Sequence, residues 1–178
     1  MNLLRTFAFH AALLLVAVPA QAHGPTPQKV EESITIAAAP ETVWAAVKDF
    51  DRLVAWNPLV ESSVGTGGNE AGGERVVVLK SGGQFTDSLD EYNDKDMFYS
   101  YRLATPDIDA FPVSFYSSTL AVKPGAGGGS EVTWDARLYR ADTGNFPSET
   151  QNDQAAIDAV TAFFQAGLKE LKIKAEGE

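Results

Sequence analysis

The sequence predicts an α+β domain in which a curved antiparallel sheet of about seven strands packs against one long C-terminal helix. Short runs of alternating apolar and polar residues, separated by glycine-rich or charged turns, occupy residues 59–140 and are typical of an antiparallel meander. Beyond them, apolar residues recur at helical spacing within a sector of about 80°, at Ile157, Val160, Phe164, Leu168 and Leu171. A sheet and a helix that each have one apolar face are expected to cover each other.

Residues 1–22 have the features of a cleaved secretory signal peptide. Arg5 provides a positive start, an apolar run extends from Ala11 to Val18, and Ala20-Gln21-Ala22 is a signal-peptidase motif. The apolar run is too short to span a bilayer and is broken by Pro19, which favours cleavage over a retained anchor. We therefore expect a mature chain that begins at His23 and is exported, to a bacterial periplasm, without stable membrane insertion.

Composition excludes several classes of function. The chain has 24 acidic and 14 basic residues, for a net charge of −10, and such a surface disfavours nucleic acids and anionic membranes. It contains no cysteine, so disulfides, thiolate metal sites and thiol catalysis are excluded. His23 is the only histidine of the predicted mature chain, so we expect neither a metal site nor a cofactor.

The first part of the mature chain predicts one strand and two short helices. Residues 23–28 include two prolines and a glycine and are expected to be flexible, with a single domain over 29–178. Residues 30–36 alternate as a half-buried strand does. Pro40 and Glu41 suit the first turn of a helix that continues to Phe50. A second short helix is expected from Asp51, which can cap it, to Pro58, which cannot continue it.

Six further strands and the long helix follow. The strands are expected at Val60–Thr66, Glu74–Lys80, Gln84–Tyr92, Met97–Leu103, Phe115–Lys123 and Glu131–Arg140. Ser148 and Gln151 form a capping-box pattern, which predicts that the long helix begins directly after Ser148.

Five short motifs accompany this order of elements. They are Ala39-Pro40-Glu41-Thr42-Val43-Trp44, Asp49-Phe50-Asp51, Trp56-Asn57-Pro58, Gly73-Glu74-Arg75 and Ser130-Glu131-Val132-Thr133-Trp134. In this order they resemble the START-like (SRPBCC) superfamily, which includes the polyketide cyclase-like and the plant pathogenesis (Bet v 1-type) allergen proteins. The resemblance covers nearly the whole mature chain and implies the helix-grip fold of that superfamily.

The start of the mature chain, residues 23–30, is similar to that of small periplasmic members found with methanol oxidation systems, the MxaD type. This similarity implies a non-catalytic accessory protein that assists a quinoprotein methanol or alcohol dehydrogenase and its cytochrome c. Many members of the superfamily have histidine where this chain has Asn57, so any role of an imidazole at that position is in doubt here.

In the START-like fold the sheet and the long helix enclose a cavity. Strand alternation and helix spacing predict its lining: Trp56, Phe85, Leu89, Tyr99, Tyr101, Leu120, Trp134, Leu138, Val160, Phe164 and Leu168. A lining of this kind suits a flat or aliphatic ligand. The alternative is that these side chains simply fill the core, because packed interiors have the same sequence pattern.

Two carboxylates alternate in phase with Phe85 and Leu89. Asp87 and Glu91 are therefore candidate cavity carboxylates with raised pKa values, although a bulge would change the phase and paired carboxylates are also common on solvated faces. We expect no catalytic residue, since the chain offers neither a serine–histidine pair nor a metal cluster.

Three functions remain open from the sequence. The first is the accessory role, in which Asn57, Pro58, Phe111 and Phe146 are candidate cavity-mouth or docking residues. The second is the binding or transport of a hydrophobic small molecule or lipid. The third is a cyclase-like enzyme that relies on Asp, Glu, Tyr or Arg alone. Phe111 and Phe146 each precede a proline and are equally consistent with anchors that fix loops to the core.

Overall fold

The computed structural model describes residues 24–177, and all seven of the strands assigned there form one antiparallel sheet in the order β1-β7-β6-β5-β4-β3-β2. The predicted signal peptide and His23 lie outside the described residues. The elements in chain order are β1 (Gln28–Ile36), α1 (Pro40–Val47), η1 (Phe50–Ala55), β2 (Val60–Thr66), β3 (Glu74–Leu79), β4 (Gln84–Asn93), β5 (Phe98–Thr105), β6 (Val113–Pro124), η2 (Ala126–Gly128), β7 (Ser130–Arg140) and α2 (Asp153–Glu176).

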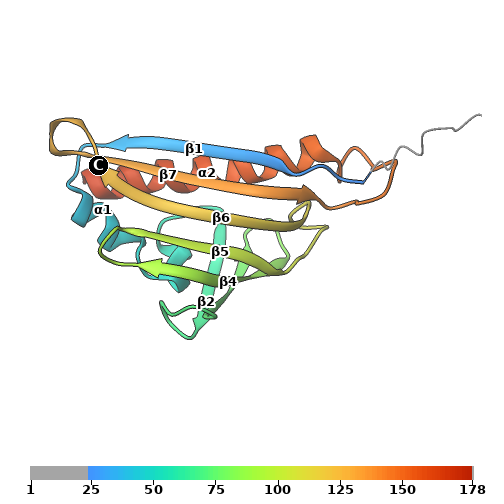
Figure 1. Ribbon diagram of the computed structural model, residues 1–178, viewed down its shortest axis with the longest axis horizontal. Coiled ribbons are helices and arrows are strands. Elements are labelled where there is room, and N and C mark those ends of the chain that lie inside the picture. Colours follow the sequence, from blue (N-terminus) through green and yellow to red (C-terminus); the bar gives the residue numbers. More distant parts are fainter. Residues whose placement is uncertain (1–23, 178) are drawn as a thin grey trace, which may run out of the picture.

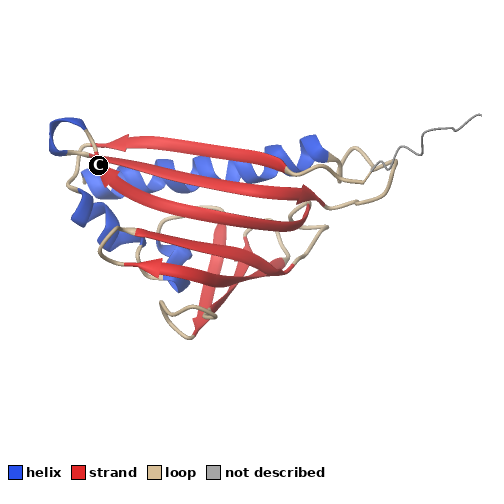
Figure 2. Cartoon of the chain, viewed as in Figure 1, coloured by secondary structure: helices blue, strands red, loops and turns tan. Residues whose placement is uncertain are grey.

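The helices cover one face of the curved sheet. Figure 1 shows α2 running along β1 and β7, with α1 near its C-terminal end, and Figure 2 shows α1, η1 and α2 on one side of the strands, whereas η2 lies in the turn between β6 and β7. The predicted α+β helix-grip architecture is therefore confirmed. It arises because alternate residues of each strand are apolar and can be buried only by the apolar face of α2 and by the two short helices.

Several element boundaries differ from those predicted. The predicted flexible segment ended at Gln28, but this residue is already in β1 and pairs with Leu138. The capping box at Ser148 is wrong, because Asn152 is the N-cap of α2 and its side chain accepts a hydrogen bond of 2.9 Å from the Ala155 amide. Asn152 lies directly before the first helical turn, where a side-chain oxygen can reach a free amide.

The centre of the core is aromatic. Trp134 of β7 stacks on Phe164 of α2, with ring centroids 4.1 Å apart, and Trp56 packs against Trp134 at 5.1 Å. Gly167 of α2 makes this packing possible, since a Cβ at that position would lie 3.0 Å from both Trp134 and the Asn57 amide. A glycine inside a helix lowers helix stability, but here it allows the two tryptophans to approach α2 closely.

The described helices also bear on membrane association. None of them combines the length and the apolar composition that crossing a membrane would require.

Candidate functional site

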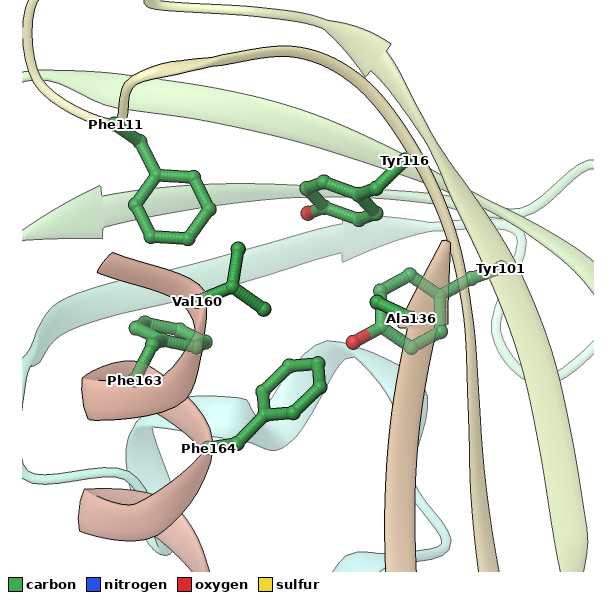
Figure 3. Close-up of a pocket in the computed structure, with 7 residues that line it drawn as sticks. All are labelled: Tyr101, Phe111, Tyr116, Ala136, Val160, Phe163 and Phe164. Carbon is green, nitrogen blue, oxygen red and sulfur yellow. The ribbon is translucent and has the colours of Figure 1, made fainter. Parts of the chain in front are cut away.

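The space between the sheet and α2 is almost completely filled. The enclosed void has a volume of about 10 Å³. It is lined by Tyr101, Phe111, Tyr116, Ala136, Val160, Phe163 and Phe164, whose side chains face one another from the sheet, a loop and α2 (Figure 3). A volume of this size holds about one water molecule, so the interior has no room for a lipid or a polyketide in this conformation.

A shallow groove lies directly outside this void. Its volume is about 160 Å³, and its lining comprises Leu59, Leu79, Lys80, Ser81, Ala110, Phe111, Ala159 and Phe163. Phe111 and Phe163 belong to both linings, and their ring centroids are 5.6 Å apart at an interplanar angle of 63°. These two rings therefore form the wall between the groove and the void.

A buried ion pair lies in the same interior. Arg75 of β3 and Asp87 of β4 are direct cross-strand partners, and both side chains are about 1% exposed. Arg75 Nε and Nη2 lie 3.0 Å and 2.9 Å from Asp87 Oδ2, and Arg75 Nη1 donates to the Phe50 carbonyl at 2.9 Å. The hydroxyl of Tyr116 donates a short hydrogen bond to Asp87 Oδ1. Both carboxylate oxygens of Asp87 are thus engaged.

Aromatic rings surround the guanidinium of Arg75. Its Cζ lies 4.2 Å from the ring centroid of Phe50 and 4.6 Å from that of Tyr101. Such contacts favour a cation in a site that water does not reach. Trp134 Nε1 donates to the Tyr101 hydroxyl at 2.9 Å and to Ser118 Oγ at 3.1 Å, which connects the ion pair to the packing under α2.

Burial shifts the pKa values of this cluster. Burial raises the pKa of Asp87, while the Arg75 guanidinium and the Tyr116 hydroxyl limit the rise by favouring the carboxylate. Burial alone would lower the pKa of Arg75, but the charge of Asp87 and the neighbouring Tyr101, Tyr99 and Tyr116 together outweigh it, and the net shift is upward. Burial raises the pKa of Tyr99 to about 12 and raises the pKa values of Tyr101 and Tyr116 further. The tyrosines are therefore neutral hydrogen-bonding groups at physiological pH.

This geometry does not suit Asp87 to acid–base catalysis. A general base must reach a proton of the substrate, whereas Asp87 is closed off by Arg75 and Tyr116. The other candidate carboxylate, Glu91, is exposed, which corrects the prediction that placed it in the cavity. The β4–β5 register shifts between Leu89 and Glu91, and this irregularity changes the face to which the strand directs its side chains.

The predicted cavity lining is buried, but only part of it borders the void. Tyr101, Val160 and Phe164 do so. The remainder are buried core residues that do not border it: Trp56, Phe85, Leu89, Tyr99, Leu120, Trp134, Leu138 and Leu168. Their positions correspond to the alternative that the sequence left open, in which they fill the core.

The four candidate mouth or docking residues have different environments. Asn57 is buried, donates to the Phe163 carbonyl at 3.1 Å and accepts from the Leu59 amide at 3.1 Å, and it also borders a surface hollow together with Pro58, so its role at a cavity mouth or docking surface stays a prediction. Its amide is needed to join the end of η1 to α2. Pro58 is exposed, Phe111 is buried against the void, and Phe146 is 96% exposed.

Sequence reasoning missed two important residues. Arg75 had entered only as part of a motif, although its alternation with the buried Val77 and Leu79 was a signal that it points inward. Phe163 lies three positions after Val160, a spacing that puts it on the buried face of α2. The described residues contain no group of three or more His, Cys, Asp or Glu side chains that could hold a metal ion.

Comparison with known proteins gives one family and several similar folds. The model of a family described as polyketide cyclase/dehydrase and lipid transport matches residues 27–176. No curated protein sequence is detectably similar to the chain. The chain is similar to protein XoxI from Bacillus cereus, with 28% identity and a TM-score of 0.68 over 82% of this chain and 94% of XoxI.

Two further solved structures have the same fold. An uncharacterized protein from Bacillus thuringiensis is 28% identical, with a TM-score of 0.70 over 85% of this chain and all of that protein. Ara h 8.0201 is 18% identical, with a TM-score of 0.65 over 86% of this chain and all of that protein, and it supports the fold alone.

The buried ion pair predicts a large difference between two arginine variants. Arg75→Leu leaves Asp87 buried without its partner and should lower the free energy of unfolding by about 3–5 kcal/mol. Arg102→Leu removes a partly exposed pair with Asp90 on the same sheet and should cost less than about 1 kcal/mol. Urea unfolding of both variants measures the difference. The double variant Arg75→Leu/Asp87→Leu should be more stable than Arg75→Leu, and equal losses for the two arginine variants would contradict a structural role for the pair.

The raised pKa values of the buried tyrosines predict a loss of stability at alkaline pH. Unfolded tyrosines release their protons near pH 10, whereas Tyr99, Tyr101 and Tyr116 keep theirs in the fold, so the stabilisation is complete below pH 10 and is lost as pH rises toward 12. The free energy of unfolding should fall by about 1.4 kcal/mol per pH unit for each such tyrosine. Urea midpoints at pH 9, 10 and 11 test this. Ionisation of all five tyrosines with a midpoint near pH 10 in the folded protein, followed by absorbance at 295 nm, would contradict it.

Proposed function

The chain belongs to the polyketide cyclase/dehydrase and lipid transport family, and we propose that within it the protein is a non-catalytic, exported accessory protein that docks on a larger partner. The partner we propose is a periplasmic quinoprotein alcohol dehydrogenase together with its cytochrome c, as the resemblance to the MxaD type implies. The predicted signal peptide at residues 1–22 supports export to the periplasm.

The observation that carries the proposal is the filled interior. A cyclase needs a volume for its substrate and a group that can exchange a proton with it. In the described structure the void is about 10 Å³, and the buried carboxylate of Asp87 is fully engaged by Arg75 and Tyr116. These features favour a function carried out on the surface over one carried out inside.

The charge of the chain supports the same proposal. With a net charge of −10, the surface attracts basic proteins and accelerates their association. Attraction of this kind is screened by salt, because the Debye length falls from about 30 Å at 0.01 M to about 8 Å at 0.15 M ionic strength.

Salt dependence tests the docking role. Surface plasmon resonance of the mature chain on the immobilised dehydrogenase and cytochrome should show association that slows about tenfold between 0.01 M and 0.15 M ionic strength. The rate of electron transfer from dehydrogenase to cytochrome, measured with and without the chain, gives a second readout. Absence of binding at low salt, or binding that salt does not change, would contradict the proposal.

A second function, the carriage of a hydrophobic small molecule, is favoured by one observation. The rings of Phe111 and Phe163 border both the internal void and the outer groove. A change in the position of either ring would join the two spaces into one larger pocket, of the kind that suits an apolar ligand. The family description also includes lipid transport.

Probe binding by the wild-type chain and by a variant without the Phe163 ring distinguishes the docking function from the carrier function. If the interior stays closed, the wild-type chain should not enhance the fluorescence of 1-anilinonaphthalene-8-sulfonate, and Phe163→Ala should do so by opening the wall. Leu171→Ala is the matched control, since it removes a buried α2 side chain that borders neither space. Near-ultraviolet circular dichroism confirms native packing of each variant. Strong probe binding by the wild-type chain would instead favour the carrier function.

A further inference from the structure

Two loops adjoin at the end of the molecule where α2 begins (Figure 1). The first, residues 106–112, joins β5 to β6, and the second, residues 141–152, joins β7 to α2. The Ala141 amide donates to the Pro112 carbonyl at 3.0 Å, and Gln151 Nε2 donates to Asp109 Oδ1 at 3.3 Å. The two segments, called here the acidic loop pair, therefore form one continuous surface.

The second loop presents a phenyl ring to solvent. Phe146 is 96% exposed, and the next most exposed large apolar side chain among the described residues is Val64 at 67%. Phe146 and Pro147 border an open surface hollow together with Gly24, Arg140 and Asn145. Aromatic side chains are usually buried at least in part, and phenylalanine is among the residues enriched in protein interfaces.

A buried arginine holds this loop in place. Arg140 is 7% exposed and directs its donors at the loop itself. Its Nε donates to the Asp142 carbonyl at 2.6 Å, and its Nη2 donates to the Gly144 carbonyl at 2.8 Å. Its Nη1 lies 3.0 Å from Asp153 Oδ2 at the start of α2. Phe146 thus projects from a backbone that is fixed two residues before it.

This fixation matters for binding. A partner that receives the phenyl ring does not have to order a flexible loop, and a preformed anchor loses less conformational entropy on association. The hydrogen bonds of Arg140 satisfy loop carbonyls and so keep the loop backbone ordered before any partner arrives.

The charge around Phe146 indicates the chemistry of the partner. The acidic loop pair contains Asp107, Asp109, Asp142 and Glu149 and no lysine or arginine, and the charge of Arg140, which borders the same hollow, is paired with Asp153. Repulsion between like charges disfavours contact with the same loops of a second copy, and it also disfavours an anionic bilayer. An apolar centre with a polar, charged rim is the usual anatomy of a protein interface.

We propose that Phe146 is the anchor by which this chain docks into an apolar pocket bordered by lysine or arginine side chains on a basic partner protein. The inference rests on the proposed docking role and adds to it the surface used and the chemistry of the partner. The partner pocket accepts the phenyl ring, and its basic rim faces the carboxylates of the acidic loop pair.

Site-specific photo-cross-linking tests the contact. A benzophenone amino acid replaces Phe146 in one form of the full chain and Phe115 in another, and each is irradiated in its own periplasm. Phe115 is the control because it is 41% exposed and lies on the sheet, in β6. The form altered at position 146, and not that altered at 115, should join covalently to a basic protein, which mass spectrometry identifies.

The protein identified by cross-linking is then purified, and its affinity for the wild-type chain and for each variant is measured. Phe146→Ala should weaken binding at least tenfold, and Glu149→Lys should slow association, whereas Phe115→Ala should change the affinity less than twofold. The melting temperature of Phe146→Ala should equal that of the wild type, because the ring makes few contacts within the chain.

The outcomes distinguish this inference from the proposed function. Cross-links to a second copy of the chain or to lipid, or no cross-link specific to position 146, overturn the inference. Unchanged binding of Phe146→Ala to the dehydrogenase or cytochrome overturns it while the accessory role stands. If the cross-linked protein is a basic protein other than the dehydrogenase or cytochrome, and Phe146→Ala loses binding to it, the result supports Phe146 as an anchor and contradicts the proposed dehydrogenase partner.

Discussion

The buried contact between Arg75 and Asp87 fixes much of the rest of the structure. Two charges that water cannot reach are tolerated only if every remaining hydrogen-bonding group around them is in place. Here the partners come from η1 through the Phe50 carbonyl, from β6 through Tyr116, and from β5 through the ring of Tyr101. The pair therefore requires one register of β3 on β4 and one position of η1 beneath the sheet. Several elements that are far apart in the sequence depend on it together.

The same contact limits what the interior can do. In a fold that can enclose a ligand, this chain occupies the space with an ion pair, aromatic rings and two tryptophans drawn close to α2 by Gly167. Such an interior is closely packed, and the rings of Phe50 and Tyr101 lie directly over the buried guanidinium. The rings of Phe111 and Phe163, which do not contact the guanidinium, border both the void and the outer groove.

Two buried arginines, Arg75 and Arg140, stabilise two different parts of the molecule. Arg75 stabilises the filled interior, while Arg140 stabilises the loop that presents Phe146 to solvent. In both cases a planar guanidinium satisfies several acceptors at once, which a lysine ammonium would do with less directional control. The surface of the acidic loop pair combines the exposed ring of Phe146 with carboxylates. The proposed docking role uses this surface and does not require an open interior.

The sequence by itself determined the order of elements, the helix-grip fold and the burial of residues such as Tyr99, Trp134 and Phe164, because strand alternation and helix spacing follow directly from backbone geometry. The tertiary structure alone decided whether those side chains leave a cavity, since packing depends on how shapes from distant elements fit together. It also placed Glu91 outside, through a local shift of register, and joined Asn57 to the carbonyl of Phe163. The partners of Arg75 and Arg140 lie on other elements or beyond a turn, and no local pattern encodes those distances.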